Sequence, residues 1–528
     1  MRPANPRVTF LVLAAGSGAF AMLQSLVTPV LPTIQAQLHT SQSTVTWVMT
    51  ANLLSAAVFT PILGRAGDAF GKRRALVAVL VVLAAGCLLA ALAPNIGVLL
   101  AARAVQGAAG AVFPLSYGII RDRFPRERVA VGVGGISAVI AAGGGVGIVL
   151  AGPIVQALGY AWLFWLPMIL AGLAALAAYL LIPSSTTSQA AHFSWPAAVL
   201  LSAWLVSLLL AVSKGPEWGW TSPAVLGLLL AAVTILAVWI VTELRSAHPL
   251  IDMRMMRLTP VWTTNLVALL FGAGQFALFA FLPQFVQTPA GAGYGFGSTV
   301  TEAGLLLLPM LVTMFVAGLV SGPIERAVSS KLQLAAGSAL SLTAFAALAL
   351  THSAQWQVAA AAALSGAGLG LAMSSMANLI VTSVPADQTG AASGMNANIR
   401  TIGGAIGTAI VGSIITAAPQ PTGLPRESGY TSAFLLLAAI STAAVAAALL
   451  IPSSRRTTHP GQAPTPGSHQ SSQTRSPEPV AGAGGVLSRA CRARSGRHHP
   501  CHRTRSRADT GPGCPYRSTG MTCSFMAM

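Results

Sequence analysis

Residues 75–93 read ALVAVLVVLAAGCLLAALA, a run of nineteen residues without a charge. This length matches the roughly 20 apolar residues that an α-helix needs to cross the hydrocarbon core of a bilayer. Because a backbone in lipid must satisfy its own hydrogen bonds, the run predicts a transmembrane helix. The basic triplet Lys72-Arg73-Arg74 stands directly before it.

Runs of similar length recur on both sides of this one. They predict fourteen spans, at about residues 9–34, 46–64, 75–93, 96–120, 130–157, 161–182, 196–213, 223–243, 262–287, 301–322, 332–351, 355–384, 399–418 and 430–451. The first run is too long for a cleavable signal peptide and other spans follow it, so we assign it as the first span. The predicted fold class is an all-α membrane protein.

The composition agrees with this class. Of 528 residues, 54% are hydrophobic and 8% are charged, whereas soluble domains carry roughly a quarter charged residues. A net charge of +18 would suggest nucleic acid as the partner of a soluble protein. Here half of the excess lies after residue 452 and the rest lies in short loops between apolar runs. We therefore expect a lipid bilayer and no nucleic acid as partner.

Basic residues predict the orientation, because Lys and Arg are retained in cytoplasmic loops. With the N-terminus inside, two basic residues, Lys214 and Arg426, fall outside. Fourteen fall in cytoplasmic loops: Arg65, Lys72, Arg73, Arg74, Arg121, Arg123, Arg126, Arg128, Arg245, Arg254, Arg257, Arg326, Lys331 and Arg400. A miscounted span would destroy this bias, so it also supports the count. The predicted location of the protein is the cell membrane, with both termini in the cytoplasm.

An internal repeat appears when the seventh and eighth spans are set aside. The second and tenth spans then correspond, and both end in Gly and a polar turn, at residues 64–68 and 322–326. Two related halves are the architecture on which alternating access operates. The predicted organisation is an N-terminal six-helix bundle (1–183), an inserted helix pair with connecting loops (184–258), a C-terminal six-helix bundle (259–452) and a basic tail (453–528).

The tail is rich in Pro, Ser, Gly and Arg, and it has too few apolar residues to offset the entropy of ordering. We predict that it is disordered. Its cysteines and histidines follow no regular zinc-ligand spacing, so no metal site is expected: Cys491, His498, His499, Cys501 and His502. Of the five cysteines, four lie in the tail and Cys87 lies in a span, so no disulfide framework is predicted.

The loop after the second span reads GRAGDAFGKRR at residues 64–74. It resembles the signature G-x-L-x-D-R-x-G-R-K/R of the major facilitator superfamily. Its glycines allow a tight turn and close helix approach, and its carboxylate can cap a helix and pair with a nearby cation. The candidate gating residues are Gly64, Asp68, Gly71, Lys72 and Arg73. They would hold two halves together in one state and release them in the other; the alternative is a solvated basic loop.

The fourth span contains LAARAVQG at residues 100–107, which resembles the R-x-x-Q-G motif of the same superfamily. Arg103 is the only basic residue predicted within a span. A charge there is costly, so it should face the interior and have a role, which in relatives is linked to proton coupling. The alternative is that Arg103 snorkels to the outer surface.

The fifth span resembles the glycine-rich antiporter motif at Gly147, Gly152 and Pro153, although Ile148 stands where relatives often have Pro. Small residues would allow close packing and the proline a kink. Ordinary helix packing explains the pattern equally well.

The inserted pair resembles one branch of the superfamily. The stretches GPEWGW at 215–220 and ELRSAHPLID at 243–252, followed by 301–304 and 388–396, resemble the fourteen-spanner drug:proton antiporters. The likeness covers residues 9 to about 451. It implies a major facilitator fold and multidrug efflux by an antiporter, as found in antibiotic resistance.

Proton coupling needs a group that changes its protonation, usually a buried carboxylate. Acidic residues before the tail lie nearly all in loops or at span ends, and the first span lacks the Asp common in relatives. Glu302, at the start of the tenth span, is the remaining candidate beside Arg103. If so, Glu302→Gln abolishes proton-driven export. The alternative is a carboxylate that only stabilises a helix start.

Uncharged polar residues within spans are candidates for the substrate cavity: Gln24, Asn52, Gln106, Asn265, Gln275 and Gln284. The alternative is that they hydrogen-bond across helices. A cavity without a fixed acid suits neutral or amphipathic substrates better than cationic ones.

The predicted function is a secondary active transporter, acting as a monomer, that exports hydrophobic or amphipathic small molecules in exchange for protons. It needs no cofactor beyond the proton gradient. One alternative is a facilitator or importer without proton coupling, and a weaker one is a membrane sensor, which lacks a folded soluble domain. No nucleotide-binding motif, metal cluster or acid/base pair occurs in the spans, so no enzyme is expected. The substrate is not encoded in any motif.

Overall fold

The computed structural model describes residues 5–183, 194–247, 249–417, 420 and 424–452. Within them, fourteen helices are long and apolar enough to cross a membrane. The predicted all-α class and span count are therefore confirmed. The predicted disordered tail, 453–528, lies outside the described residues.

Six spans form the first half, with a short connection after the first of them. They are α1 (Pro6–Val27), then η1 (Thr28–Val30) and α2 (Leu31–Gln37), α3 (Gln42–Phe70), α4 (Lys72–Ala91), the segment α5–η2–α6 (Ile96–Gly107, Ala108–Ala111 and Val112–Arg123), α7 (Arg126–Leu158) and α8 (Trp162–Leu181). The first predicted span, 9–34, is thus divided at Val27.

An inserted pair and six further spans follow. They are α9 (Trp195–Trp218), α10 (Pro223–Arg245), the short α11 (Met253–Met256), α12 (Thr259–Gln287), η3 (Ala290–Ala292), α13 (Val300–Ala327), α14 (Ser330–Leu350), α15 (Gln355–Ser383), η4 (Ala386–Gln388), α16 (Thr389–Thr416) and α17 (Glu427–Leu449). We call the six spans from α12 onward the second half.

Several helix starts are stabilised by side-chain caps. Ser41, Asn95 and Ser222 accept hydrogen bonds from backbone N–H groups in the first turns of α3, α5 and α10. Such caps satisfy donors that have no partner within the helix. These polar residues in the connections therefore set where the spans begin.

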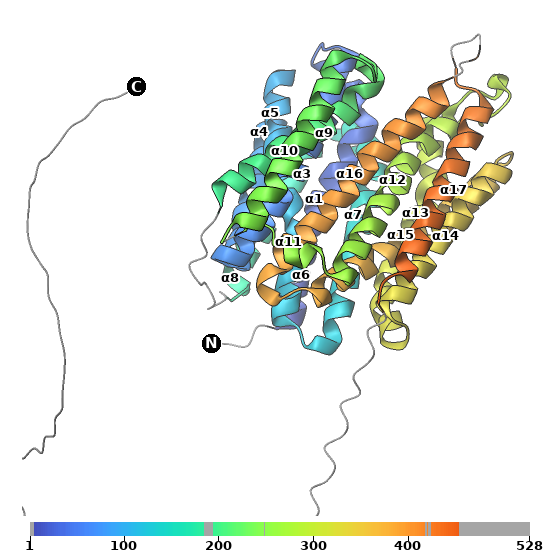
Figure 1. Ribbon diagram of the computed structural model, residues 1–528. Helices are drawn as coiled ribbons and strands as arrows, with labels where there is room; N and C mark the ends of the chain where they lie inside the picture. Colours follow the sequence, from blue (N-terminus) through green and yellow to red (C-terminus); the bar gives the residue numbers. More distant parts are fainter. Residues whose placement is uncertain (1–4, 184–193, 248, 418–419, 421–423, 453–528) are drawn as a thin grey trace, which may run out of the picture. The chain divides into compact units, whose positions relative to one another are not determined.

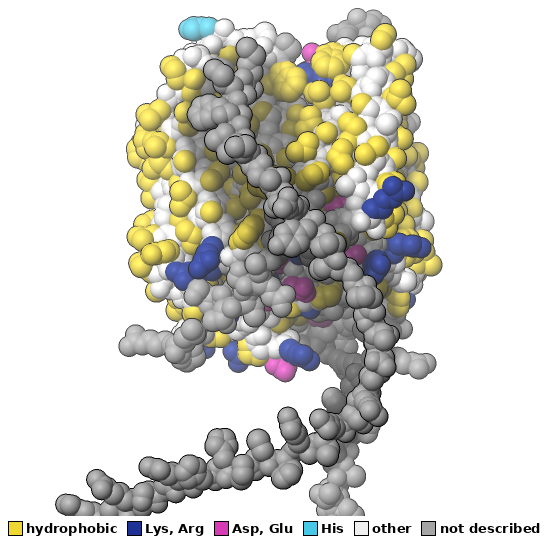
Figure 2. Space-filling model, turned by 60° about the vertical axis from the view of Figure 1, so that its left-hand side comes forward, with side chains coloured by type: hydrophobic (Ala, Val, Ile, Leu, Met, Phe, Trp, Pro, Cys, Tyr) yellow, Lys and Arg dark blue, Asp and Glu magenta, His cyan; other side chains and the backbone are white. Residues whose placement is uncertain are grey.

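The two halves meet along α3–α16 and α7–α13, while α9 lies against α3 and α16 (Figure 1). Burial separates central from peripheral helices: 67% of the span window of α15 is buried, against 17% for α10. Large apolar side chains such as Leu173 and Leu230 are exposed on the flanks. Apolar side chains cover much of the face in Figure 2, as a lipid-facing surface requires.

We call the end of the bundle that holds the α3–α4, α6–α7 and α15–α16 connections the basic end. On the face that Figure 2 shows, most Lys and Arg side chains lie toward the lower part of the molecule. The two predicted outside residues lie elsewhere: Lys214 within α9 and Arg426 directly before α17.

Two boundary predictions were wrong, and they matter for the site. The thirteenth span begins at Thr389 rather than 399, so Arg400 lies within a helix and not in a loop. Its first two turns are rich in Gly, Ala and Ser, which lowers their hydropathy although they are helical and buried. The seventh span extends to Trp218, so Lys214 also lies within a span. Arg103 is therefore not the only basic residue inside the bundle.

The fourth span changes geometry at its centre, where η2 separates α5 from α6. The adjacent glycines lie against α3: a Cβ atom on Gly107 would lie 2.5 Å from Cβ of Ser55, and one on Gly110 would collide with Thr60. Small residues thus permit the close approach of this span to α3.

Candidate functional site

A buried carboxylate closes the basic end between the two halves. Asp68, near the end of α3, accepts hydrogen bonds from the backbone N–H groups of Gly390 (3.1 Å) and Ala391 (2.9 Å) in the first turn of α16. Its side chain is fully buried. The first N–H groups of a helix lack partners within the helix and form the positive end of its dipole, so they bind carboxylates well. Asp68 therefore ties the first half to the second.

Basic side chains of the first half extend this contact. Lys72 Nζ lies 2.9 Å from a carboxylate oxygen of Asp122 and donates to the carbonyl of Ala386 at 3.0 Å. Nζ of Lys72 also lies 3.7 Å from Oδ1 of Asp68. Arg121, on α6, donates to the hydroxyl of Thr389 at 2.6 Å. Three helices of the first half thus hold the start of α16.

Glycines allow the helices to approach this closely. A Cβ atom on Gly64 would lie 2.5 Å from the carbonyl oxygen of Gly390, so the two backbones are in contact. Gly71 has a φ of +102° and is the single residue between α3 and α4. An L side chain is strained at that φ, so glycine permits the abrupt turn.

Arg73 differs from the other predicted gating residues. It donates to the backbone carbonyl of Tyr179, and its guanidinium carbon lies 5.2 Å from the centroid of that ring. Tyr179 belongs to α8, in the same half. Gly64, Asp68 and Lys72 therefore reach the second half, whereas Arg73 holds α4 against α8.

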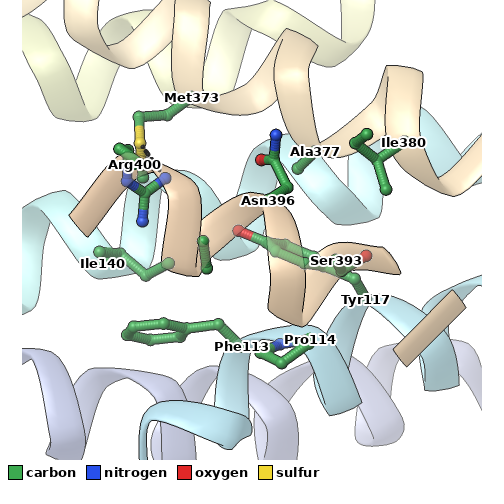
Figure 3. A pocket seen from close by; sticks show the side chains of 11 residues that line it. Phe113, Pro114, Tyr117, Ile140, Met373, Ala377, Ile380, Ser393, Asn396 and Arg400 are labelled. Atoms are coloured by element: carbon green, nitrogen blue, oxygen red, sulfur yellow. Dashed lines mark hydrogen bonds between the residues drawn. The ribbon is translucent and has the colours of Figure 1, made fainter. Parts of the chain in front are cut away.

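Further along α16, a small cavity of ≈ 20 Å³, which we call the pocket, lies between the two halves. Its lining residues are Phe113, Pro114 and Tyr117 from α6, Ile140 from α7, Met373, Ala377 and Ile380 from α15, and Ser393, Asn396, Ala397 and Arg400 from α16. Figure 3 shows Arg400 and Asn396 between Met373 on one side and the α6 ring of Phe113 on the other. Aromatic and apolar groups form most of the wall, and none of the lining residues is acidic.

Arg103 lies in a separate polar network inside the first half. Its side chain is 0% exposed, which excludes snorkelling to the surface in this conformation. Arg103 Nε donates to the carbonyl of Val48 (3.1 Å), and Nη1 donates to Gln106 Oε1 (2.8 Å). Asn52 donates to the carbonyl of Arg103 at 3.1 Å. The network joins α3 to α5, and no carboxylate among the described residues pairs with the guanidinium.

None of the six predicted cavity residues lines the pocket between the halves. Two of them, Asn52 and Gln106, belong to the Arg103 network. Asn265 accepts a hydrogen bond at 2.8 Å from Asn396, which does line the pocket. Gln275 borders a second pocket inside the second half. The other two lie apart: Gln24 is half-buried on α1 and Gln284 is exposed near the end of α12.

The glycine-rich motif of α7 acts within the first half. A Cβ atom on Gly147 would lie 2.7 Å from the carbonyl oxygen of Met22, so this glycine lets α7 contact α1. Gly152 has no atom within 4 Å of such a Cβ. Pro153 is exposed inside the continuous helix α7. Close packing thus applies to Gly147 alone among the three.

Two carboxylates of α13 have different surroundings. Glu302 is exposed and forms a capping box, in which it accepts from the N–H of Thr299 at 2.8 Å while its own N–H donates to the Thr299 hydroxyl at 3.3 Å. Glu325, at the other end of α13, accepts from the side-chain amide of Asn378 through Oε1. Its Oε2 is buried and has no hydrogen-bond partner in the described part of the chain. The geometry of Glu302 favours the helix-start interpretation.

Sequence reasoning missed the pocket residues of α16. Ser393, Asn396, Ala397 and Arg400 are spaced i, i+3, i+4 and i+7, which places them on one helical face. This spacing could have revealed them, had the span been started ten residues earlier. Assigning Arg400 to a loop removed the strongest signal.

The chain matches a known protein family over most of its length. The family model described as Major Facilitator Superfamily matches residues 13–408 and 296–494. The chain belongs to the major facilitator superfamily. The resemblance to this superfamily that the motifs predict is therefore confirmed, and the protein is a multi-pass membrane transporter.

Similar proteins include two that are named for antibiotic or drug resistance. The chain is 28% identical over 421 residues to the tetracenomycin C resistance and export protein of Streptomyces glaucescens, covering 78% of this chain and 76% of that one. It is 26% identical over 411 residues to the multidrug resistance protein Stp of Mycobacterium tuberculosis, covering 77% and 75%. The solved proton:xylose symporter XylE matches with a TM-score of 0.62 at 12% identity, over 85% of this chain and 96% of that one. That last likeness concerns the fold alone.

Proposed function

We propose that this transporter exports hydrophobic or amphipathic small molecules, such as drugs and antibiotics, by alternating access in exchange for protons. The observation that carries the proposal is the pocket between the halves, whose wall comes from α6 and α7 on one side and α15 and α16 on the other. A site built from both halves changes when they rock against each other. The names of the drug-resistance relatives support the substrate class.

The basic end faces the cytoplasm in this proposal, because Lys and Arg concentrate there. The described conformation is then closed toward the cytoplasm by the contact between Asp68 and the start of α16. Substrate enters from the cytoplasm or inner leaflet after that contact breaks, and it leaves on the outer side after the contact forms again. Because Asp68, Lys72 and Arg121 all contact the start of α16 or the residues just before it, opening this end requires these contacts to break together.

Proton exchange needs a group that gains and loses a proton during this cycle. Glu325 suits this role because one of its buried oxygens has no partner in the described chain. Glu302 remains a second candidate, as does an indirect role for Arg103. When Glu325 is protonated, its carboxyl O–H is a hydrogen-bond donor and the side chain carries no charge. When the proton is lost, the side-chain amide of Asn378 is the one described group that donates to the buried carboxylate.

A second candidate function is a facilitator without proton coupling. The lining of the pocket includes no acidic residue, so substrate and proton do not share a carboxylate there. In this alternative the substrate moves down its own gradient, and Glu325 has only a structural role.

The test is dye and drug efflux from a pump-deficient bacterial host that expresses the full chain, with and without a proton uncoupler. Export that raises resistance and stops with the uncoupler supports the proposal. Export that continues with the uncoupler favours the facilitator. Unchanged accumulation across a broad panel, with expression verified, would refute both.

A further inference from the structure

Arg400 occupies an unusual place for a charged side chain. It follows the first residue of α16 by eleven positions, which at 1.5 Å per residue places it roughly 16 Å along the helix, near the middle of a membrane core of about 30 Å. A guanidinium at this depth is costly unless it has a partner or a function.

The described part of the chain offers Arg400 little compensation. Its Nη1 lies 2.8 Å from the sulfur of Met373, which is a weak acceptor. Tyr117 interacts with it electrostatically, and Figure 3 shows both side chains at the same pocket. No carboxylate among the described residues forms an ion pair with Arg400, whereas Lys72 pairs with two carboxylates and Lys214 with one.

The wall beside Arg400 is largely apolar. Phe113, Ile140 and Ile380 present aromatic and aliphatic surface. Ser393, on the same face of α16, is 6% exposed, and its hydroxyl has no hydrogen-bond partner in the described chain. The pocket thus combines an apolar wall, an unpaired polar group and a cation without a counter-ion.

We propose that the substrates preferred by this transporter carry an acidic group, a carboxylate or an acidic phenol or enol, which binds the guanidinium of Arg400. This inference rests on the proposed function and makes its substrate class narrower: amphipathic aromatic anions. A carboxylate accepts two parallel N–H bonds from a guanidinium, and the absence of acidic residues in the wall removes repulsion. A cationic substrate meets a like charge in the same pocket, which lowers its affinity.

The experiment uses the efflux panel of the preceding section, with each compound classified by its charge at pH 7. The panel includes fluorescein, an anion, and rhodamine 123, a cation, which share the xanthene scaffold. We expect faster export of fluorescein and of other aromatic acids than of matched esters or amines. In Arg400→Gln, export of the acids falls by at least roughly tenfold, because a charge-assisted hydrogen bond is lost. Arg400→Lys keeps the charge and retains part of the rate.

The ratio of anion to cation export is the deciding measurement, because loss of folded protein lowers both rates together. Arg257→Gln is the matched control, since it removes an exposed arginine outside the pocket. An unchanged ratio of anion to cation export in Arg400→Gln overturns the inference. It is also overturned if all compounds that the wild-type protein exports are neutral or cationic. In both cases the proposed function still stands. If no compound is exported, the proposed function fails and this inference fails with it.

Discussion

Replacing Asp68 by Asn tests whether the contact with α16 holds the basic end closed. The substitution keeps the size of the side chain and one acceptor oxygen, but it removes the charge and leaves one of the N–H groups of Gly390 and Ala391 without its acceptor. Lys72 keeps its second carboxylate, Asp122, so the change is confined to the contact between the halves.

The magnitude follows from the burial of this carboxylate. A hydrogen bond to a charged group contributes about 1.5–3 kcal/mol, and full burial of Asp68 removes the screening that weakens surface pairs. Loss of one such bond shifts the equilibrium between closed and open basic ends by roughly 10- to 150-fold toward the open state.

The assay measures access to the pocket from the basic end. A cysteine at Ser393, in a chain whose own cysteines are replaced, is labelled by a membrane-impermeant maleimide in inside-out vesicles. We expect labelling of Asp68→Asn to be at least about tenfold faster than labelling of the parent. The control is Asp252→Asn, because Asp252 caps α11 by accepting from the N–H of Arg254 (2.8 Å) and does not join the halves.

Equal labelling of the parent and Asp68→Asn contradicts the reasoning. A parent that is already labelled as fast as the variant contradicts it equally, since the contact then does not keep this end closed. Faster labelling of Asp252→Asn as well would assign the effect to general loosening of the basic end.

Three other predictions concern packing, the buried arginine and the coupling carboxylate. Gly64→Ala forces the backbones of α3 and α16 apart, so it should destabilise the closed state by about 1–3 kcal/mol. The measurement is faster labelling of the pocket cysteine. The control is Gly152→Ala, where a Cβ meets no atom within 4 Å, and it should leave the labelling rate unchanged. Arg103→Lys loses the donation from two guanidinium nitrogens to two acceptors, so the purified protein should be destabilised by about 1.5–3 kcal/mol. The measurement is its melting temperature, which should fall. An unchanged melting temperature means that the network does not stabilise the first half. Glu325→Gln should remove the effect of an imposed pH gradient on export in proteoliposomes. Glu302→Gln should keep that effect and should destabilise the start of α13 by at most about 0.5–2 kcal/mol, because a helix cap is lost. The opposite outcome restores Glu302 as the coupling residue.

The fold was largely predictable because hydrophobicity acts locally. A run such as residues 75–93 must cross the bilayer wherever its neighbours lie, so counting runs predicted all fourteen spans. The motif loop was predictable for a related reason: glycine at position 71 permits a turn that a side chain would strain, which the structure shows as a positive φ. Errors arose where helical residues are small rather than apolar, as at the start of α16.

The site was predictable only in part, because contacts between the halves join residues more than 300 positions apart. Asp68 stood out in its loop, but nothing local indicated that its partners are two backbone N–H groups of α16. Arg103 and Gln106 belong to one motif in the sequence, whereas their separation from the pocket depends on how α5 packs against α3.

By itself, the sequence determined that this protein is a membrane transporter of fourteen spans, since lipid forces every long apolar run into a helix. Only the tertiary structure decided which polar groups line the pocket between the halves. Arg400 is one arginine among thirty basic residues in the chain. It becomes significant because helix packing places it at mid-membrane, in a pocket shared by both halves, with no carboxylate of the described chain to neutralise it.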